Sequence, residues 1–203
     1  MPEVALTFDD GPSSWTPEIL DLLAEHDARA TFFVIGSVAA SGLPVLERAL
    51  AAGHELANHT WSHPSLAHEC DEPRVRDELE RTSAELQRLT GLTPTRFRAP
   101  RYEVDARVEA IAADLGLVHT RGDITPPDWQ DGIPARVIAT LVLQQLAPDT
   151  VIGLHDGVPP TEVRPDRTRA ATVAALAVVL PRLAERGYRC VTASELLGRG
   201  SQP

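Results

Sequence analysis

The sequence contains no lysine, so each of its 19 basic residues is an arginine. Against 29 Asp and Glu residues these give a formal net charge of −10, and the arginines are scattered rather than clustered. An acidic chain without a basic patch is a poor match for nucleic acid or for an anionic membrane surface. We therefore expect neither as a partner.

Cysteine is scarce as well, with only Cys70 and Cys190 in 203 residues. Two cysteines so far apart pair only if the fold brings them together, and we expect two buried free thiols. Long hydrophobic runs are also missing. The longest apolar stretch, from Ala170 to Leu180, contains Thr172, ends at Pro181 and is too short to span a bilayer.

No targeting segment precedes the first expected strand, which begins near Val4. The start Met1-Pro2-Glu3 favours a cytoplasmic protein, whereas a secreted protein is expected if the sequence is a trimmed domain. With 43% hydrophobic and 24% charged residues, the composition is that of an ordinary globular protein with a substantial core. We expect one domain over residues 1–203 and favour a monomer.

Short β-rich runs alternate with amphipathic or alanine-rich runs along the whole chain. Such alternation predicts a parallel sheet, and about seven units predict a closed or nearly closed (β/α) barrel. Thr16 and Asp166 are expected to cap helices that begin at Pro17 and Arg167. The expected strands are Val4–Asp9, Ala30–Ile35, Glu55–His59, Arg96–Ala99, Val118–Arg121, Thr150–His155 and Arg189–Thr192. The expected helices are roughly Pro17–His26, Pro44–Ala52, Glu72–Thr90, Asp105–Leu115, Pro134–Leu146 and Arg167–Arg186.

Two polar clusters indicate the chemistry. Asp9 and Asp10 end the first apolar run, directly before a Gly-Pro turn, and His59 and His63 follow the third expected strand. One carboxylate and two imidazoles are a common open ligand set for Zn²⁺ or a related divalent ion. The second carboxylate is then free to take a proton from water. The combination predicts metal-assisted hydrolysis at the carboxyl ends of the strands, where barrel enzymes assemble their active sites.

Each cluster taken alone has an ordinary explanation. Adjacent carboxylates before Gly-Pro are frequent in turns, and the two histidines could lie on the surface beside Trp61. If the two clusters form one site, their side chains must point in particular directions. Asp9 and Asp10 point in different directions if both belong to a strand. His59 and His63 share a face only if their segment is helical or tightly turned.

These residues resemble the NodB-homology polysaccharide deacetylases, carbohydrate esterase family 4. That family carries, in order, a T-F-D-D-G-P, an H-x-x-x-H, an R-x-P, a D-W and a late L-x-H motif. The resemblance extends from residue 4 to about residue 197 and implies a distorted (β/α) barrel. The matching segments are Thr7 to Pro12, His59 to His63, Arg98-Ala99-Pro100 after Phe97, Asp128-Trp129, and Gly153-Leu154-His155, where glycine stands in place of leucine.

The resemblance implies that Asp10, His59 and His63 hold one divalent ion. Zinc is the default for these donors, and cobalt, nickel or manganese are alternatives, because the geometry does not select strongly among them.

The remaining roles also follow from the resemblance. Asp9 is expected to be the general base, and Arg98 to keep it ionised and oriented. His155 is expected to be the general acid, with Asp128 holding its imidazole and raising its pKa.

Around the acyl group the chain departs from its relatives. The family uses a backbone N–H just past the R-x-P proline to stabilise the oxyanion. By spacing this donor is Arg101, while Tyr102 could take the place of the family's aromatic residue. The family's leucine packs with the D-W tryptophan around the acetyl methyl; here Gly153 lies opposite Trp129. We expect either a roomier acyl pocket that discriminates weakly against larger acyl groups, or a usual pocket restored by Leu154 or another side chain.

The sequence thus predicts hydrolysis of N-acetyl groups on amino sugars of chitooligosaccharide or peptidoglycan type, with release of acetate. Acetylxylan, an ester, is also a substrate within the family. No serine or cysteine stands in a nucleophile context such as G-x-S-x-G. One alternative is a cytoplasmic deacylase or deformylase of a small metabolite or biosynthetic intermediate. A catalytically inactive sugar-binding domain is disfavoured, because the expected catalytic and metal-binding residues are all present.

Overall fold

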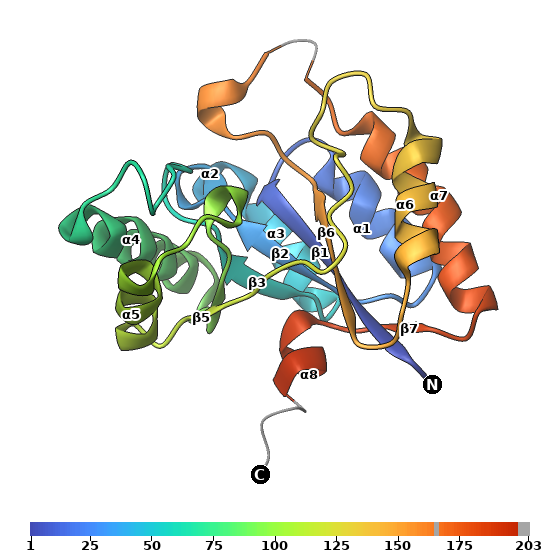
Figure 1. Cartoon of the computed structure of the whole chain (residues 1–203), viewed down its shortest axis with the longest axis horizontal. Coiled ribbons are helices and arrows are strands. Elements are labelled where there is room, and N and C mark those ends of the chain that lie inside the picture. Colours follow the sequence, from blue (N-terminus) through green and yellow to red (C-terminus); the bar gives the residue numbers. More distant parts are fainter. Residues whose placement is uncertain (165–166, 199–203) are drawn as a thin grey trace.

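A parallel sheet of seven strands forms the centre of the molecule (Figure 1). The structure, a computed structural model, describes residues 1–164 and 167–198. The strands are β1 (Glu3–Gly11), β2 (Ala30–Val34), β3 (Glu55–Asn58), β4 (Arg96–Phe97), β5 (Val118–His119), β6 (Thr150–His155) and β7 (Arg189–Cys190). They lie in the order β5-β4-β3-β2-β1-β6, and β7 also pairs with β1.

The sheet curls back on itself. At its centre, Leu6 of β1 is in register with Ala30 of β2 on one side and with Ile152 of β6 on the other. Shortly after leaving β5, the chain returns to the opposite edge of the sheet, where Ile124 forms a parallel bridge with Ile152. This connection nearly closes the sheet, and it confirms the predicted distorted barrel of parallel strands.

Helices α1 to α7 lie between successive strands and cover the outer face of the sheet, and α8 follows the last strand (Figure 1). They are α1 (Thr16–Glu25), α2 (Gly36–Ala39), α3 (Leu43–Ala51), α4 (Glu72–Thr90), α5 (Ala106–Asp114), α6 (Ala135–Gln145), α7 (Ala170–Glu185) and α8 (Ala193–Leu197). Short 3₁₀ turns, η1 (Ala40–Gly42), η2 (Pro100–Tyr102) and η3 (Pro160–Glu162), lie in the connecting segments. None of the described helices is long and apolar enough to cross a membrane.

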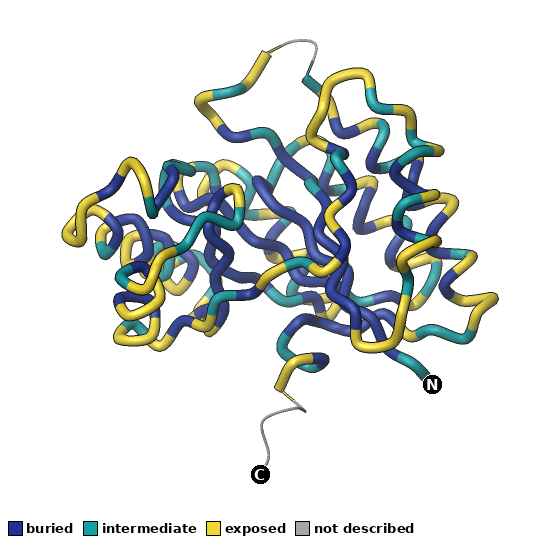
Figure 2. The backbone as a smooth tube through the Cα atoms, in the orientation of Figure 1, coloured by how far each residue is buried: buried dark blue, intermediate teal, exposed yellow. Residues whose placement is uncertain are grey.

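Two main hydrophobic clusters hold the helices on the sheet, and a third, minor one packs α8 against β1 and β6. The central strands are almost entirely buried (Figure 2). In the larger main cluster, the rings of Phe8 on β1 and Phe32 on β2 stack with their centroids 5.2 Å apart, beneath α1, α6 and α7. The smaller main cluster packs Val75 and Leu79 of α4 against Phe97 of β4. Burying one apolar stripe of each helix in this way is the main source of stability for such a layered fold.

All seven expected strands and all six expected helices are present, with small shifts at their ends. The helices α2 and α8 were not expected, because four or five residues are too few to show a helical period. Both cysteines are free and buried, as predicted.

Both expected helix caps need correction. Thr16 does not cap α1, because the helix begins at Thr16 itself and Trp15 takes the cap position without a side-chain bond. The hydroxyl of Thr16 instead donates to Asp156 at 2.6 Å. The last long helix starts at Ala170, later than predicted, and Asp166 lies outside the described residues.

Candidate active site

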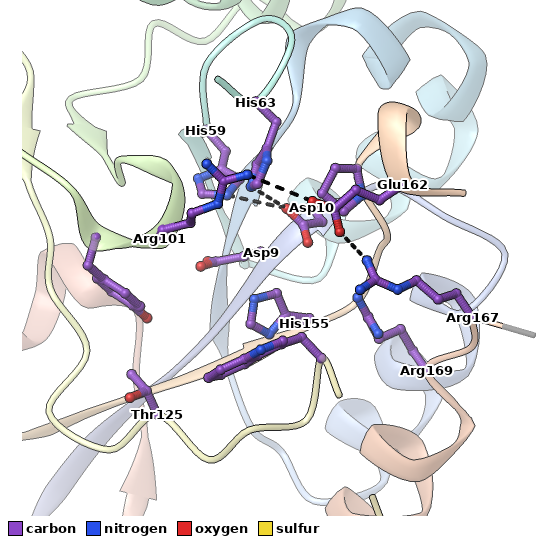
Figure 3. A pocket seen from close by; sticks show the side chains of 13 residues that line it. Asp9, Asp10, His59, His63, Arg101, Thr125, His155, Glu162, Arg167 and Arg169 are labelled. Carbon is purple, nitrogen blue, oxygen red and sulfur yellow. Dashed lines mark hydrogen bonds and ion pairs between the residues drawn. The ribbon is translucent and has the colours of Figure 1, made fainter. Parts of the chain in front are cut away.

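The predicted polar residues meet in one pocket at the carboxyl ends of the strands (Figure 3). The pocket has a volume of about 320 Å³. Its lining residues are Asp9, Asp10, His59, His63, Arg101, Tyr102, Thr125, Trp129, His155, Pro159, Glu162, Arg167 and Arg169.

Asp9 and Asp10 are separated by an irregularity at the end of β1. The register with β2 shifts between Asp9 and Gly11, and Asp10 has a positive φ of 73°. Such a bulge turns neighbouring side chains toward different partners. Asp10 faces the two histidines while Asp9 faces Arg98, so the expected division between the two carboxylates is present in the geometry.

The segment from His59 to His63 is a tight turn rather than a helix. Thr60 and His63 both have positive φ angles, of 67° and 64°. The amide oxygen of Asn58 accepts the N–H of Thr60 at 2.8 Å, and the hydroxyl of Thr60 accepts the N–H of His63 at 3.1 Å. These bonds stabilise a backbone that would otherwise be unfavourable for residues with side chains.

Glu78 of α4 stabilises the same turn by accepting hydrogen bonds from it. Its carboxylate is buried and accepts the backbone N–H groups of Trp61 at 2.9 Å and Ser62 at 2.7 Å. It also accepts the Ser62 hydroxyl at 2.7 Å. Sequence analysis missed this residue. The available signal was its position on the apolar face of α4, between Val75 and Leu79, where a carboxylate needs a partner.

Asp10, His59 and His63 form a set that fits a divalent cation. Oδ1 of Asp10 lies 3.3 Å from Nε2 of His59 and 3.2 Å from Nε2 of His63 (Figure 3). This oxygen is buried and has no hydrogen-bond partner among the described residues. One ligand atom from each of the three lies within 4.8 Å of the others. A buried carboxylate oxygen facing two imidazole nitrogens is the environment that an open zinc-type site provides.

The hydrogen bonds and pKa values of the three residues leave their ligand atoms free of protons at neutral pH, as metal binding requires. His59 directs Nδ1 at the carbonyl of Arg98, 2.8 Å away; with the proton on Nδ1, the lone pair of Nε2 points toward Asp10. Burial, together with the nearby charge of His59, lowers the pKa of His63 to about 4. Burial alone would raise the pKa of Asp10, but the contact with His59 and the charges of His155 and His63 outweigh it and lower the pKa to about 2. Metals bind these deprotonated forms.

Arg98 holds Asp9. The guanidinium is fully buried and donates from Nη1 to Oδ1 of Asp9 and to the hydroxyl of Thr7, each at 2.7 Å. Its Nε donates to the carbonyl of Thr120 at 3.0 Å, and its carbon lies 4.1 Å from the ring centroid of Phe33. An arginine held by this many contacts fixes the orientation of the Asp9 carboxylate.

His155 is held by Asp128. Its Nδ1 lies 2.7 Å from Oδ1 of Asp128, and its backbone N–H donates to Oδ2 at 2.9 Å. Thr172 of α7, a residue that sequence analysis missed, donates to the same Oδ2 at 2.8 Å. Burial lowers the pKa of His155, but the charge and hydrogen bond of Asp128 outweigh it and raise the pKa to about 9. The ring of Trp129 packs edge-on against the imidazole of His155, with the two ring centroids 5.5 Å apart.

Of the backbone N–H groups of Arg101, Tyr102 and Glu103, one has no acceptor among the described residues. The N–H of Tyr102 donates to Ala99 and that of Glu103 to Pro100, whereas the N–H of Arg101 makes no hydrogen bond among the described residues. Arg101 and Tyr102 have consecutive positive φ angles of 56° and 59°. By position, the available donor is therefore Arg101, the residue that the motif spacing indicated.

Of the two alternatives for the space beside Gly153, the structure favours a pocket restored by another side chain over a roomier one. A Cβ at this position would lie only 2.4 Å from the hydroxyl oxygen of Tyr102 and 3.3 Å from the methyl of Thr125. The space that a leucine would need is thus filled by another side chain. Leu154, which we expected at the substrate, is buried in the larger hydrophobic cluster, because alternate residues of a strand face opposite sides.

A charged rim at the pocket mouth was not foreseen. The guanidinium of Arg101 lies 4.0 Å from Glu162, which also pairs with Arg167 (Figure 3). Arg169 is buried and donates from Nε to the carbonyl of Gly157 at 2.6 Å. In the sequence, Arg167 and Arg169 are indistinguishable from the scattered surface arginines, and Arg101 stood out only for its backbone N–H.

Comparison with known proteins agrees with the motifs. The family model described as polysaccharide deacetylase matches residues 1–119. A chitooligosaccharide deacetylase of Sinorhizobium fredii is 42% identical over 192 residues, which cover 92% of this chain and 88% of the relative. A peptidoglycan-N-acetylglucosamine deacetylase of Bacillus cereus is 35% identical over 191 residues, covering 94% of this chain and 66% of the relative.

Among solved structures, a family 4 acetyl xylan esterase from Clostridium thermocellum, in complex with a cobalt ion, superposes with a TM-score of 0.86. It is 35% identical, and the match covers 98% of this chain and 92% of the esterase. Sequence, motifs and fold agree, and this chain belongs to the polysaccharide deacetylase family.

Proposed function

We propose that this protein is a metal-dependent deacetylase that hydrolyses N-acetyl groups on amino sugars and releases acetate. One observation carries the proposal. The pocket that contains Asp10, His59 and His63 also contains Asp9 and His155, and each of these two groups is held by its own buried partner. Hydrolysis of an amide needs a base for the water and an acid for the amine, and the pocket offers both.

Asp10, His59 and His63 are the residues that would hold the metal ion. When bound there, a divalent ion supplies Lewis-acid polarisation of the acyl carbonyl and activation of water. We propose zinc, because two imidazoles and one carboxylate are ligands that zinc accepts in open catalytic sites. The same donors also accept cobalt, nickel or manganese.

The proton transfers follow from the partners of Asp9 and His155. Asp9, oriented by Arg98, accepts a proton as a water oxygen attacks the acyl carbon. With its pKa raised to about 9, His155 is protonated at neutral pH and donates to the nitrogen as the carbon–nitrogen bond breaks. The free N–H of Arg101 is the candidate donor to the negative oxygen that forms during the attack. The products are acetate and a free amine.

The names of the relatives favour chitooligosaccharides and peptidoglycan as the substrate class. The charged rim supports the same class, since Arg101, Glu162 and Arg167 at the mouth offer hydrogen-bonding groups to sugar hydroxyls.

The test measures acetate release from N-acetyl chitooligosaccharides and from peptidoglycan. Acetylxylan and N-formyl or N-acetyl metabolites are assayed in parallel as alternative substrates. We expect amide deacetylation of an amino-sugar substrate to have the highest kcat/KM, and Asp10→Ala to abolish it. Preferential cleavage of a small N-acyl metabolite would favour the metabolite deacylase instead. Sugar binding without acetate release would favour an inactive binding domain.

A further inference from the structure

The pocket has two unlike sides. One side is charged and open, and the other is uncharged. In Figure 3, Thr125 lies on the opposite side of Asp9 and His155 from Glu162 and Arg167. Besides Asp9, Asp10 and the histidines, the charged lining residues are Arg101, Glu162, Arg167 and Arg169, and the uncharged ones are Tyr102, Thr125, Trp129 and Pro159.

This division dictates how an N-acyl sugar fits. The carbonyl oxygen must face the site formed by Asp10 and the two histidines, and the amide nitrogen must face His155. The third substituent of the carbonyl carbon is the acyl chain, which is apolar. Burial of apolar surface is favourable, whereas burial of an unpaired charge is costly. This favours the uncharged side for the acyl chain and the charged mouth for the sugar.

Tyr102 ends the pocket on the uncharged side. Its hydroxyl oxygen lies where a side chain at either of two glycines would be, 2.4 Å from a Cβ built on Gly153 and 2.9 Å from one on Gly122. A Cβ essentially never lies this close to another heavy atom, so a side chain at either glycine would require the phenol to shift. The phenol therefore occupies space that the two glycines leave free.

The phenol is also held in a neutral state. Its ring centroid lies 5.3 Å from the guanidinium carbon of Arg98. Burial, reinforced by the nearby charge of Asp9, raises the pKa of Tyr102 above its ordinary value. The wall that the acyl chain meets is thus an uncharged aromatic ring and its hydroxyl.

We propose that Tyr102 sets the size limit of the acyl group, by occupying the space beside Gly153 so that acetyl fits and longer chains do not. This inference rests on the proposed function, and it assigns a specificity-determining role to a residue whose hydroxyl occupies space left by two glycines. The enzyme should discriminate steeply in favour of acetyl.

The test compares kcat/KM for N-acetyl, N-propionyl and N-butyryl forms of one chitooligosaccharide. In Tyr102→Ala we expect the ratio of butyryl to acetyl to rise about tenfold or more, because hydrophobic pockets discriminate by about 10- to 200-fold per methylene. The double variant Tyr102→Ala with Gly153→Leu should restore preference for acetyl, since the leucine refills the vacated space. The matched control is Tyr188→Phe, which alters a tyrosine packed on the hydrophobic core away from the pocket and should leave the ratio unchanged.

Because ratios are compared within one variant, a general loss of kcat does not affect the result, and thermal unfolding verifies that each variant is folded. A ratio that stays at the wild-type value in folded Tyr102→Ala would overturn the inference. So would a wild-type enzyme that cleaves butyryl as well as acetyl. If the wild type cleaved none of the three compounds, the proposed function would fail instead, which keeps the two failures distinct.

Discussion

Asp128 holds both ends of His155, accepting the backbone N–H on one carboxylate oxygen and contacting the ring Nδ1 with the other. The ring is therefore fixed in orientation, and its positive form is stabilised. Because the pKa of His155 is raised to about 9 and the protonated form is required as the acid, activity should be lost as the pH rises through that value.

Asp128→Asn should shift this alkaline limb to lower pH. The substitution removes the charge that raises the pKa of His155, while burial still lowers it. A profile of kcat against pH measures the shift. The limbs of this profile report the titration of the coupled site as a whole. Thr172→Val is the matched control, because it removes one hydrogen bond to Asp128 but keeps the charge, and should shift the limb less. An unmoved limb in Asp128→Asn would mean that His155 is not the acid.

Asp9→Asn should separate chemistry from metal binding. The amide cannot take a proton from water, so kcat should fall about 10²-fold or more, the usual scale for a general base. Metal content should stay at the wild-type level, because Asp9 contacts Arg98 rather than the histidines. Turnover near that of the wild type would assign the proton transfer to another group.

Glu78→Ala should weaken the metal site without touching any ligand. The turn between His59 and His63 loses its acceptor for two backbone N–H groups, and we expect metal affinity to fall about 10- to 100-fold, as for other groups that orient ligands. Competition with a chromophoric chelator measures the affinity. Glu80→Ala on the exposed side of the same helix is the control. Equal affinities in the two variants would contradict a positioning role for Glu78.

His54 should make the fold sensitive to acid. Its Nδ1 accepts the N–H of Ala30 at 3.1 Å, and burial, with the charges of Arg29 and Arg48, lowers its pKa from 6.5 to about 4. A histidine whose pKa is lowered on folding stabilises the native state at pH values above its pKa in the unfolded chain. This stability is lost as the pH falls from 6.5 to about 4.

Denaturant unfolding at pH 7 and pH 4 checks this. In His54→Gln the drop in the free energy of unfolding between the two pH values should shrink by on the order of 1 kcal/mol, allowing for residual solvation. His68→Gln, on an exposed position, should leave the drop unchanged. An identical drop in His54→Gln and the wild type would show that His54 does not contribute.

Much of the fold was readable from the sequence, because strands such as Thr150–His155 and helices such as Glu72–Thr90 are long enough for their pattern to dominate. The residues of the candidate site were accessible for a different reason. Asp9, Asp10 and His59 stand at strand ends, and parallel strands bring their carboxyl ends to one edge.

The remaining features depend on contacts between distant segments. The gap at Gly153 is visible in the sequence, but its filling by Tyr102 depends on how the turn after Pro100 packs against β6. Glu78 is one of several acidic residues on α4, and its role appears only when the histidine turn docks on it. Packing decides such details, and no local pattern encodes them.

The most direct measurement is a zinc titration of the chelator-treated enzyme, with acetate release from a chitooligosaccharide as the readout. We expect no activity without metal, and recovery that stops rising at one equivalent of zinc per chain. His59→Ala should recover no activity and bind no stoichiometric zinc. Full activity in the metal-free enzyme, or full zinc occupancy in His59→Ala, would contradict a hydrolytic metal site at Asp10, His59 and His63.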